Sequence, residues 1–258
     1  AIHSSIAALA LEANVSEPTV NRFCRSMDTR GFPDFKLHLA QSLANGTPYV
    51  NRNVNEDDSV ESYTGKIFES AMATLDHVRH SLDKSAINRA VDLLTQAKKI
   101  AFFGLGSSAA VAHDAMNKFF RFNVPVVYSD DIVLQRMSCM NCSDGDVVVL
   151  ISHTGRTKNL VELAQLAREN DAMVIALTSA GTPLAREATL AITLDVPEDT
   201  DIYMPMVSRL AQLTVIDVLA TGFTLRRGAK FRDNLKRVKE ALKESRFDKQ
   251  LLNLSDDR

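Results

Sequence analysis

The chain has 258 residues, an ordinary apolar content of 45% and a formal net charge of −2, which together suit one or two folded domains. So small a charge gives no overall attraction to nucleic acid or to an anionic membrane, although a local basic face stays possible. The sequence shows no apolar run of about 18 residues and no secretory leader. We therefore expect no membrane partner and a cytoplasmic location.

The first part of the chain, residues 1–46, has helical patterns and no alternating strand pattern, which predicts a small all-helical domain. Residues 47–59 are polar, contain Pro48 and lack periodicity, so we expect a linker there. The remainder, residues 60–258, is predicted to form a second domain. Helices of the first domain are expected over residues 4–14, 17–27 and 32–44.

The stretch "SIAALALEANVSEPTVNRFCRSM" has the spacing of a helix-turn-helix motif. Asn14 is able to take the left-handed turn conformation between two helices, and Ser16 is a good N-cap for the second. We expect Val15, Val20 and Phe23 to fix that second helix to a core. Its polar side chains would then face solvent and contact bases and phosphates of double-stranded DNA. They are Ser16, Glu17, Thr19, Asn21, Arg22 and Arg25.

The charge of this region does not decide between DNA binding and a structural role. Residues 1–50 hold four Arg or Lys and four Asp or Glu, so the segment is not basic overall. A plain helical hairpin that packs on the second domain is therefore the alternative. The pattern alone leaves both interpretations open.

In the second domain, helical patterns over residues 59–82 and 85–97 come first, and strands and helices alternate after them. Most strand patterns are continuous apolar runs, as expected for strands buried on both faces of a parallel sheet. Two helices, over residues 204–225 and 226–245, close the chain. We predict a three-layer α/β/α fold around a parallel sheet. Its strands are expected over residues 99–106, 124–129, 146–152, 172–179 and 190–196.

A glycine-rich turn follows the first predicted strand. The pattern G-x-G-x-x-A that starts at Gly104 fits a dinucleotide-binding fingerprint, and Asp130 and Asp131 follow at about the 20-residue distance which that fingerprint requires. However, Ser107 and Ser108 lie in the turn, where a dinucleotide gains little from hydroxyls. These serines favour a smaller ligand.

A second hydroxyl-rich turn, "ISHTGRTKNL", follows the third predicted strand. Ser152, Thr154 and Thr157 surround Gly155 where a helix begins, and helix starts attract phosphate through unpaired N–H groups. Two such turns at the carboxyl edge of one sheet could share one anion, although hydroxyls that only cap their own helices are the alternative. The residues predicted to bind this phosphate are Gly106, Ser107, Ser108, Ser152, His153, Thr154 and Thr157.

Catalytic residues are harder to identify. An isomerase would need a positioned general base, and His113, His153 and Glu198 are the nearest candidates. Each has an equally good structural explanation, and the sequence shows no pair of a base and an orienting group. We therefore predict no catalytic residue.

The cysteines do not indicate a metal or a disulfide. Their number is odd, with Cys24 alone and Cys139 and Cys142 in C-x-x-C spacing. A structural zinc site would need a second pair of ligands, and none follows at a suitable spacing. We therefore predict no metal site and regard the C-x-x-C spacing as incidental.

Two stretches, "GLGSSAAVAHDAMNKFFRFN" and "ISHTGRTKNLVELAQLARENDAMVIALTS", resemble the ligand loops of sugar isomerase (SIS) domains. The stretch "NVSEPTVNRFCRSMDTRGFPDFKLHL" is similar to the helix-turn-helix of the RpiR family of bacterial regulators. The resemblance implies a SIS domain that binds the phosphate of a phosphosugar through the hydroxyls of both turns. The usual second-loop pattern is S-x-S-G-x-T, and this chain has Thr154 at the middle position, which keeps the hydroxyl.

The resemblance also implies a function. It implies a transcriptional regulator, mainly a repressor, that binds operator DNA as a homodimer or tetramer and needs no cofactor. Similarity to the family's regulators of glucose catabolism implies 2-keto-3-deoxy-6-phosphogluconate, an intermediate of the Entner–Doudoroff pathway, as the effector. The alternatives are a phosphosugar isomerase with a helical appendage, a nicotinamide-dependent enzyme and, more distantly, a structural adaptor.

Overall fold

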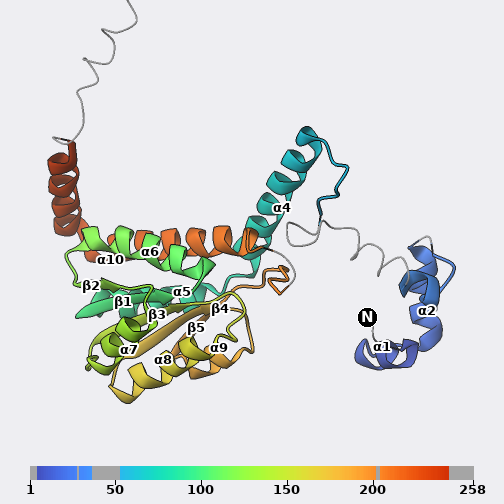
Figure 1. Ribbon diagram of the computed structural model, residues 1–258, viewed down its shortest axis with the longest axis horizontal. Helices are drawn as coiled ribbons and strands as arrows, with labels where there is room; N and C mark the ends of the chain where they lie inside the picture. Colours follow the sequence, from blue (N-terminus) through green and yellow to red (C-terminus); the bar gives the residue numbers. More distant parts are fainter. Residues whose placement is uncertain (1–4, 28, 37–52, 202–203, 244–258) are drawn as a thin grey trace, which may run out of the picture. The chain divides into compact units, whose positions relative to one another are not determined.

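The computed structural model describes residues 5–27, 29–36, 53–201 and 204–243. Contacts divide the chain into two units (Figure 1). The predicted linker and the domain limits beside it stay a prediction. The first unit comprises Ala1–Ser70 and Asp199–Met204, and the second comprises Ala71–Glu198 and Pro205–Arg258.

The first unit contains the predicted pair of short helices, α1 (Ile6–Glu12) and α2 (Glu17–Ser26). Asn14 joins them with a positive φ of 53°, the left-handed conformation expected of it. Residues 32–36 are also helical, whereas the rest of the helix predicted over 32–44 lies outside the described residues. The buried side chains that hold these segments together are Ala10, Val20, Cys24 and Phe32.

Two of the three predicted anchors of α2 were wrong. Val15 and Phe23 are 42% and 54% exposed, and only Val20 is buried. Cys24 takes the inner position because it lies one helical turn after Val20 on the same face. Phe23 lies at the rim of this core, where its ring packs edge-on against Phe35 at 6.0 Å.

The second unit is built on the predicted parallel sheet of five strands, in the order β2-β1-β3-β4-β5. All neighbouring pairs are parallel, and Lys99 pairs with Asp146 where β1 and β3 begin. The order of the strands reverses at β1, which is the point where open α/β sheets bind ligands. The strands are β1 (Lys99–Gly104), β2 (Val126–Tyr128), β3 (Asp146–Ile151), β4 (Met173–Thr178) and β5 (Leu190–Thr193).

Helices cover both faces of this sheet, as predicted (Figure 1). Alternate residues of each strand pack on opposite layers, so Phe102 joins the core under α5, α6 and α10 (Val207–Lys243) while Phe103 joins the core under α7 and α8. This burial on both faces explains why β1, β3 and β4 are continuously apolar. The other helices of this unit are α5 (Lys84–Gln96), α6 (Ser107–Phe119), α7 (Ile132–Met140), α8 (Lys158–Glu169) and α9 (Pro183–Glu187), with a 3-10 turn η1 (Phe120–Phe122). A further helix, α4 (Val60–Ser81), begins in the first unit and ends in the second.

The end of the chain differs in detail from the prediction of two helices. One helical segment, α10 (Val207–Lys243), is interrupted at Gly228, where φ is 77° and ψ is −163°. Only glycine adopts this backbone conformation readily, so the break falls there rather than after residue 225. Within the described residues, no helix has both the length and the apolar content that crossing a membrane requires.

Candidate phosphate site and DNA-reading helix

The sheet brings the two hydroxyl-rich turns to one edge. Gly104, the last residue of β1, pairs with Ile151, the last residue of β3. The turns that begin at Leu105 and Ser152 therefore leave adjacent strands at the same carboxyl edge, where the strand order reverses. This is the position in which both turns can face one ligand.

In the first turn, the backbone folds tightly against the start of α6. Gly106 has a positive φ of 57°, and a Cβ added to Gly104 would lie 2.6 Å from the Ser108 carbonyl oxygen. Both glycines are therefore required by conformation or by close approach. Ser107 and Ser108 occupy the first turn of α6, Ser108 is buried, and no hydrogen bond of either hydroxyl is found among the described residues. Their hydroxyls are free to bind a ligand.

In the second turn, two hydroxyls already accept hydrogen bonds. Ser152 Oγ accepts from Gly155 N at 3.1 Å, and Thr154 Oγ1 accepts from Arg156 N at 3.4 Å. Each hydroxyl keeps its own proton, which it can donate to a phosphate oxygen. Thr157 is the N-cap residue of α8, but its side chain makes no capping hydrogen bond. Hydrogen bonds from the turn's own backbone therefore account for the hydroxyls of Ser152 and Thr154, but for no hydroxyl of the first turn.

Supporting residues from β4 and α9 were not predicted. Gly155 has a φ of 58°, and a Cβ there would collide with the hydroxyls of Thr178 and Thr182. Ser179 Oγ donates to the His153 carbonyl at 2.7 Å, which fixes the start of the turn to the end of β4. The signal in the sequence was a third hydroxyl-rich stretch, "TSAGT", at the end of the fourth strand.

Gln135 is a further residue that the sequence did not single out. It is fully buried on α7, and its Nε2 donates to the Ser129 carbonyl at 2.7 Å and to the Gly104 carbonyl at 3.4 Å. One side chain therefore ties the ends of β1 and β2 together directly before the first turn. A glutamine within an ordinary helical pattern gives no sign of such a contact.

The three candidate bases have structural partners. His153 Nε2 lies 3.0 Å from the backbone carbonyl of Glu198. The Glu198 carboxylate accepts from the N–H groups of Met206, Val207 and Ser208 at 2.7, 2.9 and 3.2 Å and from the Ser208 hydroxyl. Glu198 therefore caps the start of α10, where a carboxylate also meets the helix dipole favourably.

The third candidate base, His113, and an acidic residue of the dinucleotide fingerprint also have structural partners. His113 stacks on Tyr128, with 4.9 Å between the ring centroids. Asp131, one of the acidic residues of the dinucleotide fingerprint, caps α7 by accepting from Leu134 N at 2.9 Å. Within the described residues, neither His113 nor His153 has a carboxylate side chain as a hydrogen-bond partner.

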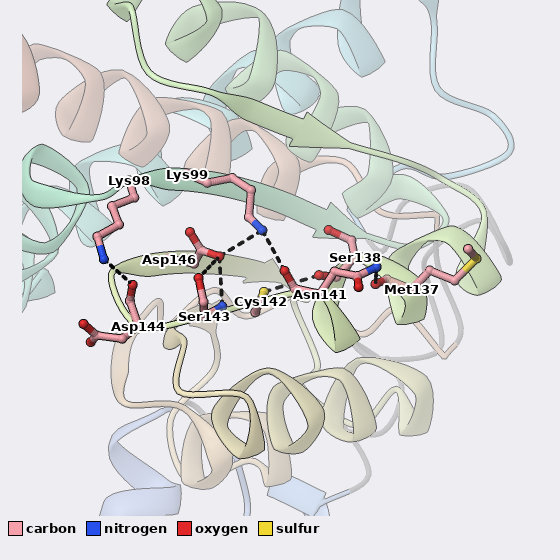
Figure 2. A network of polar contacts seen from close by, with 9 residues as sticks. All are labelled: Lys98, Lys99, Met137, Ser138, Asn141, Cys142, Ser143, Asp144 and Asp146. Atoms are coloured by element: carbon pink, nitrogen blue, oxygen red, sulfur yellow. Dashed lines mark hydrogen bonds and ion pairs between the residues drawn. The ribbon is translucent and has the colours of Figure 1, made fainter.

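A polar network lies at the opposite, amino end of β1 and β3 (Figure 2). Lys99 Nζ is 2.9 Å from Asp146 Oδ2 and donates to the Asn141 carbonyl at 3.2 Å, near the end of α7. Ser143 N donates to Asp146 Oδ2 at 3.0 Å, and Lys98 Nζ donates to the Asp144 carbonyl at 2.9 Å. The network joins α7 to β3 and lies away from the two turns.

The C-x-x-C cysteines lie beside this network. Cys142 Sγ donates to the Ser138 carbonyl at 3.4 Å (Figure 2). Burial raises the pKa of the Cys139 thiol to about 12 and also raises the pKa of Cys142. Both thiols are thus poor nucleophiles and poor metal ligands. The described residues contain no cluster of three or more groups that could hold a metal ion.

In the first unit, α2 presents most of the predicted DNA-contacting set to solvent. Ser16, Glu17, Arg22 and Arg25 are exposed, and Arg22 Nη2 donates to Thr19 Oγ1 at 3.2 Å. These side chains form a polar, partly cationic surface on one short helix.

Asn21 is the exception. It is half-buried, and its Oδ1 accepts from Phe32 N at 3.0 Å, so the prediction that it faces solvent was wrong. The physical reason is the return of the chain after α2. That return brings an unpaired backbone N–H against this helix, and the amide oxygen of Asn21 satisfies it.

The fold and the two sites define a class: a helix-turn-helix domain joined to a SIS domain. A helix-turn-helix domain of the rpiR family matches residues 1–46, and a SIS domain matches residues 93–222. The chain belongs to the RpiR family. It is 58% identical to the HTH-type transcriptional regulator HexR of Pseudomonas aeruginosa over 243 residues, which cover 94% of this chain and 85% of that protein.

Other relatives and solved structures match all or part of the chain. The bifunctional protein glk of Paraburkholderia xenovorans is 38% identical over 93% of this chain, which spans only 38% of that protein. The fold is similar to the solved structure of Vibrio vulnificus NanR complexed with ManNAc-6P, with a TM-score of 0.66. The two sequences are 24% identical, and the match covers 96% of this chain and 88% of the NanR chain. The sugar isomerase domain of the RpiR transcription factor from Sphaerobacter thermophilus is 19% identical over 69% of this chain and 98% of that one, with a TM-score of 0.59.

Proposed function

We propose that the protein is a transcriptional repressor of glucose-catabolic, Entner–Doudoroff genes, and that 2-keto-3-deoxy-6-phosphogluconate is its effector. The observation that carries the proposal is the pair of turns at the carboxyl edge of β1 and β3, with the unengaged hydroxyls of Ser107 and Ser108. Several O–H donors beside two helix starts suit a phosphate dianion. The identity of the sugar acid rests on the likeness to HexR.

The ligand residues in this proposal are those of the two turns. Their hydroxyls donate to the phosphate oxygens, and the helix starts of α6 and α8 add favourable electrostatics. The complex of NanR with ManNAc-6P, a related fold with a phosphorylated sugar, supports this class of ligand. The full set is Gly106, Ser107, Ser108, Ser152, His153, Thr154 and Thr157.

On the DNA side, Arg22 and Arg25 of α2 contact the operator together with Ser16, Glu17 and Thr19. The protein acts as a homodimer or tetramer in the cytoplasm, because two-fold related helices read two half-sites of an operator. The effector releases DNA only if it binds one conformation of the protein more tightly than the other.

The protein is not an enzyme in this proposal. All of the Glu198 carboxylate's described contacts serve the start of α10, and in the described part of the chain neither imidazole has an orienting carboxylate. A phosphosugar isomerase is the second candidate, favoured only by the shared SIS fold.

The test starts from a DNA duplex that the purified protein itself selects from a random pool. Fluorescence anisotropy then follows the release of this duplex as phosphosugars, phosphosugar acids or NAD are added. We expect release by 2-keto-3-deoxy-6-phosphogluconate and no response to NAD. Turnover of a phosphosugar without any duplex binding would support the isomerase instead.

A further inference from the structure

The end of the chain carries a strong local excess of positive charge. Between Arg226 and Lys243 the sequence has eight Lys or Arg and two Asp or Glu, although the whole chain has a net charge of −2. These residues form the part of α10 around and beyond the break at Gly228, drawn in red in Figure 1. A basic segment on an otherwise acidic chain is the pattern of a surface that meets a polyanion.

Aromatic contacts fix this part of α10 to the rest of its unit. The ring of Phe231 packs against Phe122 at 5.6 Å and against Phe223 at 5.7 Å. The Arg227 guanidinium lies 5.2 Å from the Phe223 ring, and Arg226 pairs with Asp92. Arg226 and Arg227, directly before the break, therefore make contacts within the fold that hold the helix in place.

Three cations at the far end of the segment and on η1 have no such partners among the described residues. Arg121 of η1 gathers with Lys239 and Lys243 around one cavity of about 460 Å³. All three side chains are exposed, and no carboxylate of the described residues lies within ion-pair distance of any of them. None of the residues that line the cavity is acidic. The other lining residues are Phe122, Leu235, Val238 and Leu242.

We propose that this basic surface, made of Arg121, Lys239 and Lys243, binds the phosphate backbone of duplex DNA beside the operator. The proposal rests on the proposed function, because a chain with a DNA-reading helix meets duplex DNA as its principal polyanion. Unpaired lysines and arginines add sequence-independent affinity by releasing counterions from DNA. The surface is built from η1 and α10, so it differs from the effector turns after β1 and β3.

The test is the salt dependence of binding to the selected duplex. In one variant, Lys239→Gln is combined with Lys243→Gln, and the matched control combines Lys84→Gln with Arg89→Gln, two exposed cations on α5. The slope of log affinity against log salt should become shallower by about 0.9 for each phosphate contact removed. We expect this change in the first variant only, with unchanged melting temperatures and unchanged effector affinity in both.

Three results would overturn the inference. Equal slopes for the variant and the control would mean that DNA does not meet these lysines. An unchanged DNA slope, combined with lost binding to vesicles of anionic lipid, would assign the surface to membranes. A parent protein that selects no duplex would remove the proposed function as well, whereas the first two results leave that function intact.

Discussion

At the scale of single residues, Arg22 and Arg25 are the side chains on which DNA reading depends. They lie three residues apart on α2, and both are exposed, so they share a face that could reach guanine edges or phosphates. Arg22→Ala or Arg25→Ala should abolish operator binding in gel shifts and leave effector binding intact. Glu12→Ala, an exposed change on α1, is the control, and gel shifts unchanged in both arginine variants would refute the assignment.

Gly155 is the residue where the second turn tolerates no side chain. Gly155 has a positive φ, and an added Cβ would collide with the hydroxyls of Thr178 and Thr182. Gly155→Ala therefore strains the backbone and displaces β4 or α9. We expect a loss of about 1–3 kcal/mol in unfolding free energy, measured with urea, and weaker effector binding. Gly181→Ala is the comparison, because a Cβ there meets nothing although its φ of 70° is also positive. Equal losses would show that φ alone matters.

At the scale of elements, the ion pair at the start of β1 and β3 joins strands to α7. Asp146 is buried and accepts from Ser143 N while pairing with Lys99. Asp146→Ala would leave that N–H without a partner, so unfolding should cost about 1–3 kcal/mol less than in the parent. Urea unfolding measures this loss of unfolding free energy. Asp144→Ala, at an exposed neighbouring residue, should change the unfolding free energy little. A parent-like midpoint for Asp146→Ala would contradict this account of the network.

The buried Cys139 thiol of α7 leads to a prediction of how stability depends on pH. Burial raises the pKa of Cys139 from 9.0 to about 12, so the unfolded chain loses this proton first as pH rises. The contribution to stability is complete below pH 9.0 and is lost progressively towards pH 12. Urea unfolding at pH 8 and at pH 10 should therefore show a larger drop in the parent than in Cys139→Ala. If the unfolding free energy fell equally in the parent and in Cys139→Ala, burial of the thiol would not be the cause of this pH dependence.

How far the sequence predicts these elements depends on how local the signal is. All five predicted strands are present, and in β1, β3 and β4 burial on both faces explains the continuous apolar run. The predicted strands extend past the observed ends, since turn residues such as Ser152 and Ser179 follow without a change of pattern. The break in α10 depends on one glycine, Gly228, which periodicity cannot locate.

The candidate site divides in the same way. The hydroxyls of both turns could be recognised from sequence, because glycine and serine cluster there between a strand and a helix. The contacts of Gln135 with Gly104 and of Glu198 with α10 could not, because they join segments far apart in the chain. A capping glutamate and a catalytic glutamate look alike until the backbone N–H groups around them are known.

At the scale of the whole molecule, the proposed regulation requires that phosphate binding in one domain controls DNA binding in the other. That coupling exists only if the effector's affinity differs between two states of the protein. Neither Ser108 nor Ser152 belongs to α2, so their loss should separate the two activities.

Calorimetry with 2-keto-3-deoxy-6-phosphogluconate, on the parent and on Ser108→Ala and Ser152→Ala, tests this claim most directly. Each lost hydroxyl should cost roughly 1.5–3 kcal/mol, or about ten- to a hundredfold in affinity, because each removes a hydrogen bond to a charged group. Both variants should still bind operator DNA and remain bound when the effector is added. If both variants bound the effector as tightly as the parent, or if the parent preferred NAD, the shared phosphate site of the two turns would be contradicted.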